Sequence, residues 1–532
     1  MKKSKKSGFN PSGIQNPSGT QNPSGIQNSN DIQKQAVDSV LEKNSDSAVP
    51  KSFEPPLTES ARLLGFGLEP FFRSKINKVL KEKDGFVICE LKSGERKYFV
   101  KGFPSLSVSE ALAVSSVLSE FQSSQDKKSG KTIEFFLDEY CLKNNLELEQ
   151  DQAKYLLAVV EKLAFGLGPL DELLKNDDIE EIGIVGLHSP VRVFEKGFGW
   201  LSTNLFFENE KTVKNLANKM ARPLGRRLSM QTPRINAVLS DGSRLHAAIE
   251  PVSFSGPVVT IRKFRQKPFT PLDLALHQTI TLEALAFLWL VLETDCSVLV
   301  CGNTGSGKTT TLNALFGFVP QNERIVIVEE TPEMRVPHVH QVRLSASEEL
   351  GVSMQSLILD SLRMRPDRVV IGEIRSAIEV KAFVDTLLAG QGKGSFGTFH
   401  SQSAGEAVTR MRTMGVDEMD LASIGLIVVQ RRWTVRQSDG GRREVRKVTE
   451  ISEVELDNGA LKLNLLFGYD FAQNKLVREN QSKTLEKKIM QSFGFGSVEL
   501  AGEQARRMDW LSKASLQGLG WREFFEEANR YG

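Results

Sequence analysis

The chain has 532 residues, of which 40% are hydrophobic and 25% are charged, as in an ordinary soluble globular protein. Lys and Arg number 68 against 66 Asp and Glu, and this near balance gives no support to a protein that tracks nucleic-acid phosphates. The longest apolar stretch, residues 282–293, is too short to span a bilayer, and no apolar segment follows the basic N-terminus as in a secretory signal. We therefore expect a cytoplasmic protein that meets a membrane only through a partner.

The N-terminal part of the chain is expected to lack a folded core. Residues 1–54 are low in complexity and contain tandem NPSGIQ and NPSGTQ units, with too little apolar surface to offset the entropy of ordering. We interpret them as a disordered tail. Residues 55–150 have the composition of a globular protein and are expected to form an accessory region.

The four cysteines have no metal-ligand spacing, which predicts free thiols in a reducing compartment: Cys89, Cys141, Cys296 and Cys301.

Two further domains are expected, because the length indicates roughly three or four in all. Residues 151–264 begin with a helical pattern and continue in short alternating runs, with a hairpin signal at Asp241-Gly242, which predicts a small α+β domain. The proline-containing residues 265–271 form a linker. Residues 272–532 alternate strand-like and helical segments, which predicts a parallel sheet covered by helices, followed by a hairpin and helices at the C-terminus.

Four apolar strands of this last domain end in polar or glycine-rich sequence: SVLVCGNTGSGK, RIVIVEETPE, RVVIGEIR and GSFGTFHSQ. In such sheets ligands bind at the carboxyl ends of the strands. The first segment matches the P-loop pattern, which cradles phosphates with backbone N–H groups, and a chance match is expected in roughly 2% of chains of this length. Lys308 is expected at the β- and γ-phosphates and the Thr309 hydroxyl on magnesium. The predicted nucleotide-binding residues are Gly302, Asn303, Thr304, Gly305, Ser306, Gly307, Lys308, Thr309 and Thr310.

The strand that should carry a magnesium-binding aspartate carries Gly372 instead, followed by Glu373. A second strand tip supplies three more carboxylates, Glu329, Glu330 and Glu333. One of these groups is expected to hold or orient water around magnesium while another polarises the attacking water. A single glutamate at a strand end is typically a solvated residue at a helix N-terminus. Several strand tips meeting at a P-loop favour a catalytic site.

The four strand segments resemble the Walker A, Asp box, Walker B and His box of the type II and type IV secretion, pilus-assembly and archaeal-filament ATPases. Two upstream segments resemble the N-terminal domain of the archaeal-type branch of this family: GPLDELLKNDDIEEIGIVG and PRINAVLSDGSRLHAAIEPVS. The resemblance covers about residues 150–470. It implies a RecA-like P-loop C-terminal domain after a smaller α+β N-terminal domain, and it accounts for Gly372, since the family has Gly-Glu in its Walker B.

The same resemblance assigns roles to individual residues. Glu373 is the Walker B glutamate, and His400 is the His-box histidine that senses the γ-phosphate. A second histidine common in the family is absent from AGQGKGS. Glu330 stands where the family commonly has aspartate and is a metal-ligand candidate with Thr309, but either Glu329 or Glu330 can position the water. Phosphate-contacting or finger arginines are expected at Arg244, Arg262, Arg335 and Arg343, although a surface ion pair is as good an expectation for each. For Arg375 a subunit contact and an ion pair stay open.

The family implies hydrolysis of ATP with Mg²⁺ by a homo-hexamer at the cytoplasmic face of a membrane, bound to a polytopic platform protein. Hydrolysis drives assembly or retraction of a pilus-like filament, or secretion. The alternative is a nucleic-acid translocase with a RecA-like motor, which the near-neutral charge and the lack of aromatics along a basic track disfavour. The basic ribbon with Arg431, Arg432, Arg442 and Arg443 is better explained as a solvated hairpin or a subunit contact. A scaffold that binds ATP without hydrolysing it is the third possibility.

Overall fold

The computed structural model describes residues 57–69, 75–101, 106–126, 130–265, 267–347, 350–390, 392–436 and 442–531. The expected disordered tail, residues 1–54, lies outside them. The chain divides into two compact units, one made of residues 1–55 and 101–166 and the other of residues 56–100 and 167–532. None of the helices in the described ranges combines the length and the apolar character that crossing a membrane requires.

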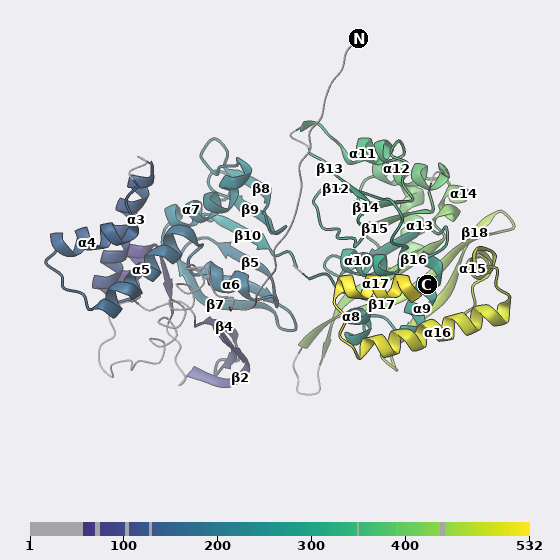
Figure 1. Cartoon of the computed structure of the whole chain (residues 1–532), viewed down its shortest axis with the longest axis horizontal. Coiled ribbons are helices and arrows are strands. Elements are labelled where there is room, and N and C mark those ends of the chain that lie inside the picture. Colours follow the sequence, from purple (N-terminus) through teal and green to yellow (C-terminus); the bar gives the residue numbers. More distant parts are fainter. Residues whose placement is uncertain are drawn as a thin grey trace, which may run out of the picture. The chain divides into compact units, whose positions relative to one another are not determined.

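The first unit is a group of three helices, α3 (Val108–Asp126), α4 (Ile133–Lys143) and α5 (Gln150–Phe165), that pack on one another (Figure 1). The Thr132 side chain accepts a hydrogen bond from the backbone N–H of Phe135 and so caps the start of α4. Phe121 of α3 meets Phe136 of α4 edge to face, with ring centroids 6.3 Å apart. A shared apolar interior therefore holds the three helices together.

The second unit begins with a ten-stranded sheet in the order β2-β3-β4-β7-β6-β5-β10-β9-β8, with β1 paired to β7. β4 and β7 pair in parallel, so residues 76–100 share this sheet with residues 179–262, although different regions were expected for them. The predicted hairpin at Asp241-Gly242 joins β8 to β9, and Gly242 has the positive φ of 89° that its turn requires. The domain boundaries themselves stay predictions. The strands are β1 (Phe66–Leu68), β2 (Ile76–Lys83), β3 (Phe86–Leu91), β4 (Arg96–Val100), β5 (Ile179–Val185), β6 (Pro190–Glu195), β7 (Gly199–Phe207), β8 (Arg234–Val238), β9 (Arg244–Ala248) and β10 (Val258–Arg262), with helices α2 (Leu57–Leu64), α6 (Leu170–Lys175) and α7 (Glu210–Ala221).

A second, nine-stranded sheet has the order β13-β12-β14-β15-β11-β16-β17-β18-β19. From β13 to β16 the strands are parallel, and from β16 to β19 they are antiparallel. The predicted parallel sheet and its RecA-like character are confirmed, with β15 inserted between β11 and β14. The strands are β11 (Val298–Gly302), β12 (Ile325–Glu329), β13 (Gln341–Ser345), β14 (Arg368–Ile374), β15 (Gly394–Phe399), β16 (Leu426–Arg436), β17 (Arg442–Asp457), β18 (Ala460–Asp470) and β19 (Lys475–Arg478).

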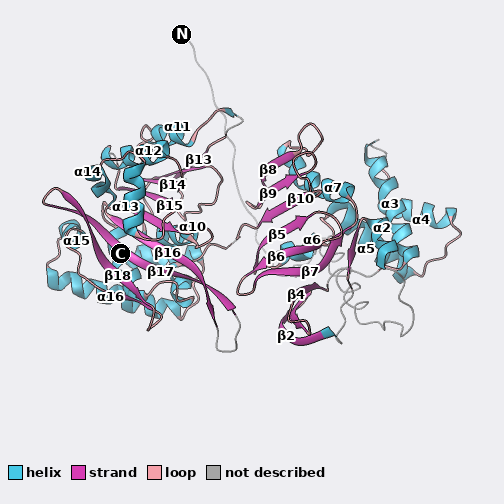
Figure 2. Ribbon diagram, turned by 180° about the vertical axis from the view of Figure 1, so that it is seen from behind, coloured by secondary structure: helices cyan, strands magenta, loops and turns pink. Residues whose placement is uncertain are grey.

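Helices cover both faces of the second sheet (Figures 1 and 2). Residues of α9, α10 and α16 share one buried cluster with Val298 and Val300 of β11, while residues of α11 to α13 share the other with Leu299 and Cys301. Burial on both faces explains why β11 is apolar without alternation. The helices are α8 (Pro271–Leu276), α9 (Leu282–Leu292), α10 (Lys308–Leu315), α11 (Met354–Ser361), α12 (Ala377–Leu388), α13 (Ala404–Thr413), α14 (Glu418–Leu421), α15 (Leu485–Phe493), α16 (Ser497–Ser515) and α17 (Trp521–Tyr531).

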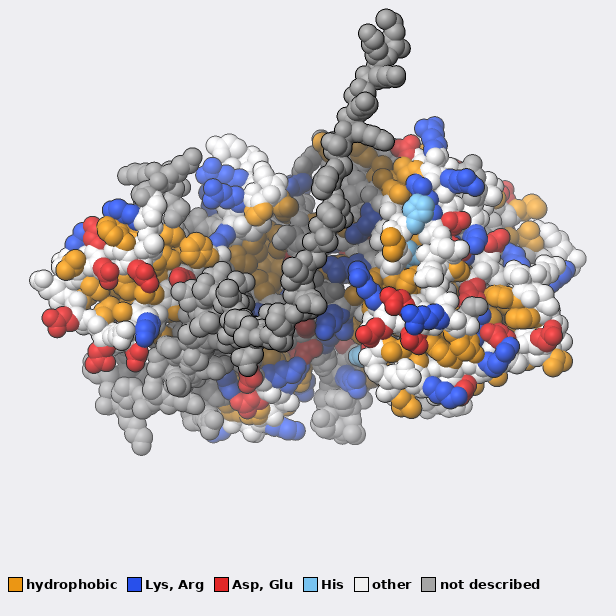
Figure 3. All heavy atoms as spheres, viewed as in Figure 1, with side chains coloured by type: hydrophobic (Ala, Val, Ile, Leu, Met, Phe, Trp, Pro, Cys, Tyr) orange, Lys and Arg blue, Asp and Glu red, His pale blue; other side chains and the backbone are white. Residues whose placement is uncertain are grey.

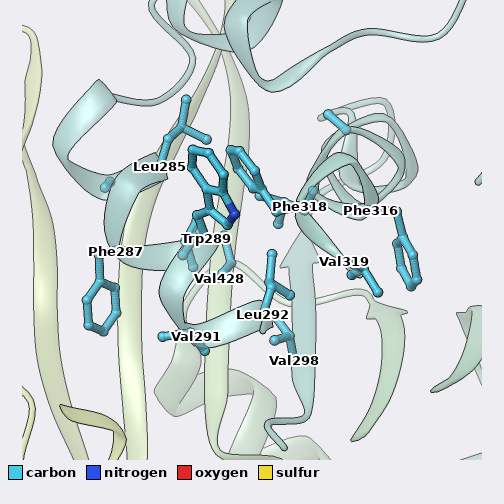
Figure 4. Packing of buried hydrophobic residues seen from close by; sticks show 14 of the residues in the cluster. Leu285, Phe287, Trp289, Val291, Leu292, Val298, Phe316, Phe318, Val319 and Val428 are labelled. Carbon is cyan, nitrogen blue, oxygen red and sulfur yellow. The ribbon is translucent and has the colours of Figure 1, made fainter. Parts of the chain in front are cut away.

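The apolar stretch that was too short for a membrane span is the core helix α9. Its residues from Ala284 to Leu292 are all buried, and Trp289 stacks on Phe318 with ring centroids 5.0 Å apart (Figure 4). Trp289 also meets Trp510 of α16, so the C-terminal helices complete this core. At the surface, acidic and basic side chains are interspersed over this domain on the face drawn in Figure 3.

Candidate functional site

The P-loop connects β11 to α10 in a conformation that only glycines tolerate. Gly305 and Gly307 have φ values of 71° and 96°, and Gly307 is the residue before the first turn of α10. A Cβ on Gly302 would lie 2.0 Å from the carbonyl oxygen of Gln430, so the loop lies against β16 as closely as backbones allow. Helix α10 begins at Lys308 and points its N-terminal N–H groups toward the loop.

The loop fits a phosphate group. Lys308 is 8% exposed, and its ammonium group donates to the carbonyl oxygens of Gly302 and Asn303, at 3.1 and 3.3 Å. Burial lowers the pKa of Lys308, and the negative charge of Glu373 opposes that shift, so the two side chains sense each other's charge. The Ser306 hydroxyl is buried and has no hydrogen-bond partner among the described residues. A buried cation, an unpartnered hydroxyl and a helix N-terminus together define an anion-binding cradle.

Glu329 and Glu330 have different environments although they are neighbours in sequence. Glu329 is 3% exposed, and one of its carboxylate oxygens accepts from the backbone N–H groups of Glu333 and Met334, both at 2.7 Å. Burial raises the pKa of Glu329 above its usual range. The side chain of Glu330 is half exposed and forms an ion pair with Arg375. Glu329 therefore holds its own loop, whereas Glu330 is open to solvent.

Gly372 is explained by this buried Glu329 side chain. A Cβ on Gly372 would lie 2.9 Å from Cγ of Glu329, closer than a real Cβ contact. The Thr398 hydroxyl donates to the carbonyl oxygen of Gly372 at 2.6 Å and fixes the same backbone from β15. An aspartate in place of Gly372 would need the space that Glu329 fills.

Glu373 is the centre of a charged cluster. Its carboxylate meets Nε2 of His400 at 2.5 Å and a guanidinium nitrogen of Arg375 at 2.6 Å. Burial raises the pKa of Glu373, but the hydrogen bonds and charges of Arg375 and His400 outweigh burial and leave it below its ordinary value. The Arg375 guanidinium thus bridges Glu373 and Glu330, from the tips of β14 and β12. Glu373 is accordingly ionised at neutral pH.

The four predicted arginines take two kinds of position. Arg244 and Arg262 form ion pairs with Glu333, at 2.8 and 3.9 Å, and Arg343 forms one with Glu329, at 3.4 Å. The Arg335 guanidinium lies over the ring of Phe264, 4.3 Å from its centroid. Three of the four therefore contact carboxylates of the segment 329–333.

A magnesium ion would rely on the substrate for most of its ligands. In the described part of the chain no three His, Cys, Asp or Glu side chains are grouped so as to hold a metal. Magnesium is bound in nucleotide sites through one or two protein oxygens together with phosphate oxygens and water. The Thr309 hydroxyl in the first turn of α10 and the Glu330 carboxylate are of the right chemical type for those protein ligands.

The structure adds residues of β16 that the motifs did not indicate. Gln430 donates from Nε2 to the carbonyl oxygen of Ser306 at 2.7 Å, and its Oε1 accepts from the Thr311 hydroxyl. The Asn303 side chain exchanges two hydrogen bonds, both 2.9 Å long, with the backbone of Arg432. In the sequence, Gln430 is visible only as a glutamine that follows the apolar run LIVV. That pattern points to the P-loop only once β16 is known to pair with β11.

The basic ribbon formed by β16 and β17 is paired with acids in part. Arg446 makes a two-pronged contact with Glu180, at 2.9 and 2.8 Å, and both Arg432 and Arg446 contact Glu444. The predicted hairpin is present, and residues 437–441 lie outside the described residues. All four cysteines are free, as predicted.

The fold and the site define a P-loop protein of RecA-like architecture with acidic strand tips. The family model described as "Type II/IV secretion system protein" matches residues 201–490, more than half of the chain. The chain therefore belongs to this family, and the resemblance found in the sequence is confirmed.

The chain is similar to individual relatives and solved structures to different extents. An uncharacterized protein of Methanocaldococcus jannaschii, MJ0900, is 30% identical over 369 residues, which are 66% of this chain and 64% of the relative. The chain thus spans less than two thirds of that relative's length. The type IV secretion system protein PtlH of Bordetella pertussis is 30% identical over 279 residues, 47% of this chain and 80% of PtlH. The crystal structure of the pilus retraction motor PilT with bound ADP is matched over 68% of this chain and 95% of PilT, at 18% identity and a TM-score of 0.40.

Proposed function

We propose that this chain hydrolyses ATP with Mg²⁺ and that hydrolysis powers a membrane-bound machine, through assembly or retraction of a type IV pilus-like filament or through type II or type IV secretion. The observation that carries the proposal is the pairing of two sites on one sheet edge. A phosphate cradle with a buried lysine stands at the end of β11, and an ionised carboxylate bound to a histidine stands at the end of β14. Family membership supports the same conclusion.

The side chains divide the work of phosphoryl transfer to water as follows. Lys308 neutralises charge on the β- and γ-phosphates, and the backbone N–H groups at the start of α10 hold the β-phosphate. Glu373 orients the attacking water and draws on its proton, while His400 fixes the Glu373 carboxylate and senses the γ-phosphate. Bound magnesium supplies positive charge to the transferring phosphoryl group. Because Glu329 is committed to its loop, we assign the second water-positioning carboxylate to Glu330 rather than Glu329.

The arginines are proposed to exchange partners when ATP binds. Arg244 and Arg262 both contact Glu333, and a γ-phosphate carries more negative charge than one carboxylate. Guanidinium groups stabilise the charge that develops on the phosphoryl oxygens during transfer. Arg343 is close enough to the Asp-box carboxylates for the same role, whereas Arg335 would have to leave the ring of Phe264.

The partners follow from the family rather than from the site. We propose a homo-hexamer at the cytoplasmic face of the membrane, attached to a polytopic platform protein whose filament or export substrate it moves. No nucleic acid is part of this proposal, since the chain is nearly neutral and Arg432 of the basic ribbon is paired with Glu444.

Phosphate release from ATP by the purified chain, with and without Mg²⁺, tests the activity, and light scattering on the same samples tests the ring. The expected result is Mg²⁺-dependent turnover that Lys308→Ala abolishes, and a hexamer favoured by nucleotide. Arg363→Ala is the matched control, because its side chain is 86% exposed. Wild-type protein that binds nucleotide as a hexamer but releases no phosphate would show a scaffold rather than an ATPase.

A further inference from the structure

Gln430 occupies a position that no nucleotide-binding motif describes. It lies on β16, which pairs in parallel with β11, and it is the residue opposite Gly302 in that pairing. Gln430 is 3% exposed. A buried glutamine costs free energy unless its amide is hydrogen-bonded, so the partners of Gln430 indicate its purpose.

Both partners belong to the phosphate-binding segment. Ser306 contributes its carbonyl oxygen, which can only accept, so the amide atom that faces it at 2.7 Å must be the Nε2–H donor. The remaining amide oxygen then faces the Thr311 hydroxyl of α10, which donates to it. Gln430 therefore connects the loop before Lys308 to the helix after it, and its orientation is determined by the loop.

The bond to Ser306 determines where the next N–H group points. In a trans peptide the C=O and the following N–H lie on opposite sides of the chain. Because the Ser306 carbonyl is drawn toward β16, the Gly307 N–H is turned away from β16, at the start of α10 where phosphates bind. The Ser306 N–H, by contrast, donates to the carbonyl of Asn303 at 3.1 Å. A Cβ on Gly307 would lie 3.0 Å from Nε2 of Gln430, so a side chain at position 307 would press against the amide group that binds Ser306.

A second pair of bonds fixes the other end of the loop on the same strand. The Asn303 side chain exchanges hydrogen bonds with the backbone of Arg432, two residues after Gln430. Strand β16 thus contacts the loop at Asn303, at Ser306 and, through Gly302, at its first residue. Strand β16 therefore supports the loop at three positions.

We propose that Gln430 is a positioning residue for the phosphate site, which orients the Ser306–Gly307 peptide so that the Gly307 N–H meets the β-phosphate of a nucleoside diphosphate or triphosphate. This inference rests on the proposed nucleotide site and adds the residue that shapes it. The Ser306 bond carries the effect, and the Thr311 bond contributes stability.

The test compares two variants at Gln430 with one at Thr311. Gln430→Glu keeps an acceptor for Thr311 but loses the donor to Ser306, and Gln430→Met keeps the side-chain length without either bond. Thr311→Val removes only the other bond. Binding of fluorescent ADP with Mg²⁺ and the thermal midpoint of the nucleotide-free chain are measured for each, and KM and kcat for ATP are measured alongside.

Loss of one well-oriented donor to a charged phosphate predicts an ADP affinity weakened on the order of tenfold in both Gln430 variants. KM for ATP rises by a similar factor while kcat changes less than KM. Thr311→Val lowers the thermal midpoint but weakens ADP binding less than either Gln430 variant. Gln430→Glu could weaken binding by burying a charge, and Gln430→Met controls for this because its side chain is apolar.

Two outcomes would overturn the inference: ADP affinity within about twofold of wild type in Gln430→Met, or a loss in Thr311→Val as large as in the Gln430 variants. The second outcome would mean that packing of α10, not the Ser306 peptide, sets the affinity. Failure of the proposed function has a different signature, since the wild-type protein would then either bind no ADP at all or bind ADP but release no phosphate from ATP.

Discussion

Substitution of Gly372 tests whether the buried side chain of Glu329 leaves no room for an aspartate before Glu373. A Cβ at this position would lie 2.9 Å from Cγ of Glu329 and 3.3 Å from its Oε1. Relieving such overpacking costs about 1–3 kcal/mol. Gly372→Ala should therefore lower the free energy of unfolding by that amount. Gly372→Asp should lower it further, because a second carboxylate would face the 3% exposed Glu329.

A double-mutant cycle separates this contact from a general intolerance of side chains at Gly372. Glu329→Ala removes Cγ and Oε1, the two closest atoms that a new Cβ would meet, so Gly372→Ala should cost much less in that background, a coupling of about 1–2 kcal/mol. Urea unfolding followed by tryptophan fluorescence reports mainly the domain concerned, because Trp289, Trp433, Trp510 and Trp521 lie in it and only Trp200 lies on β7. Additive effects of the two substitutions would refute the steric account of Gly372.

Three further expectations concern other parts of the same domain. Arg368 is fully buried and donates hydrogen bonds to Glu323 and to three backbone carbonyls. Arg368→Ala should therefore lower the free energy of unfolding by about 3–5 kcal/mol. Arg363 is exposed, so Arg363→Ala should cause no measurable change in the same urea assay. Burial raises the pKa of Glu453, but hydrogen bonds from Ser482, Thr484 and nearby backbone N–H groups outweigh burial and leave the pKa below its usual value. The stabilisation by Glu453 is therefore full above the unfolded pKa of about 4.5 and is lost as pH falls through the folded pKa, so Glu453→Gln should flatten the fall of the urea midpoint below about pH 4.5. Arg375→Ala should reduce kcat for ATP more than Arg375→Lys does, since a lysine retains the charge between Glu330 and Glu373; equal loss in both would mean that the planar guanidinium is required.

Local sequence predicted much of the site because its motifs stand at strand ends. The P-loop glycines, Lys308, Glu373 and His400 lie on segments whose strand-helix alternation is visible without a structure. In parallel sheets such ends converge, and the structure places His400 against Glu373 as the strand pattern suggested. The family assignment depended on the same segments and was confirmed by the match over residues 201–490.

What sequence could not provide depends on long-range pairing and on side-chain direction. Gln430 contacts the P-loop only because β16 pairs with β11, over a hundred residues earlier in the chain. Glu329 and Glu330 are chemically alike, and only the backbone N–H groups that Glu329 caps distinguish them. The parallel pairing of β4 with β7 likewise joins residues 76–100 to a sheet whose other strands lie far along the chain.

Turnover by Glu373→Gln, measured with ADP binding on the same protein, tests the central claim most directly. The claim is that an ionised Glu373, held by His400, acts on water at a nucleotide cradle built separately around Lys308. It predicts ADP affinity within about twofold of wild type and kcat reduced on the order of a hundredfold or more. Unchanged turnover in Glu373→Gln, with wild-type protein active, would contradict the claim.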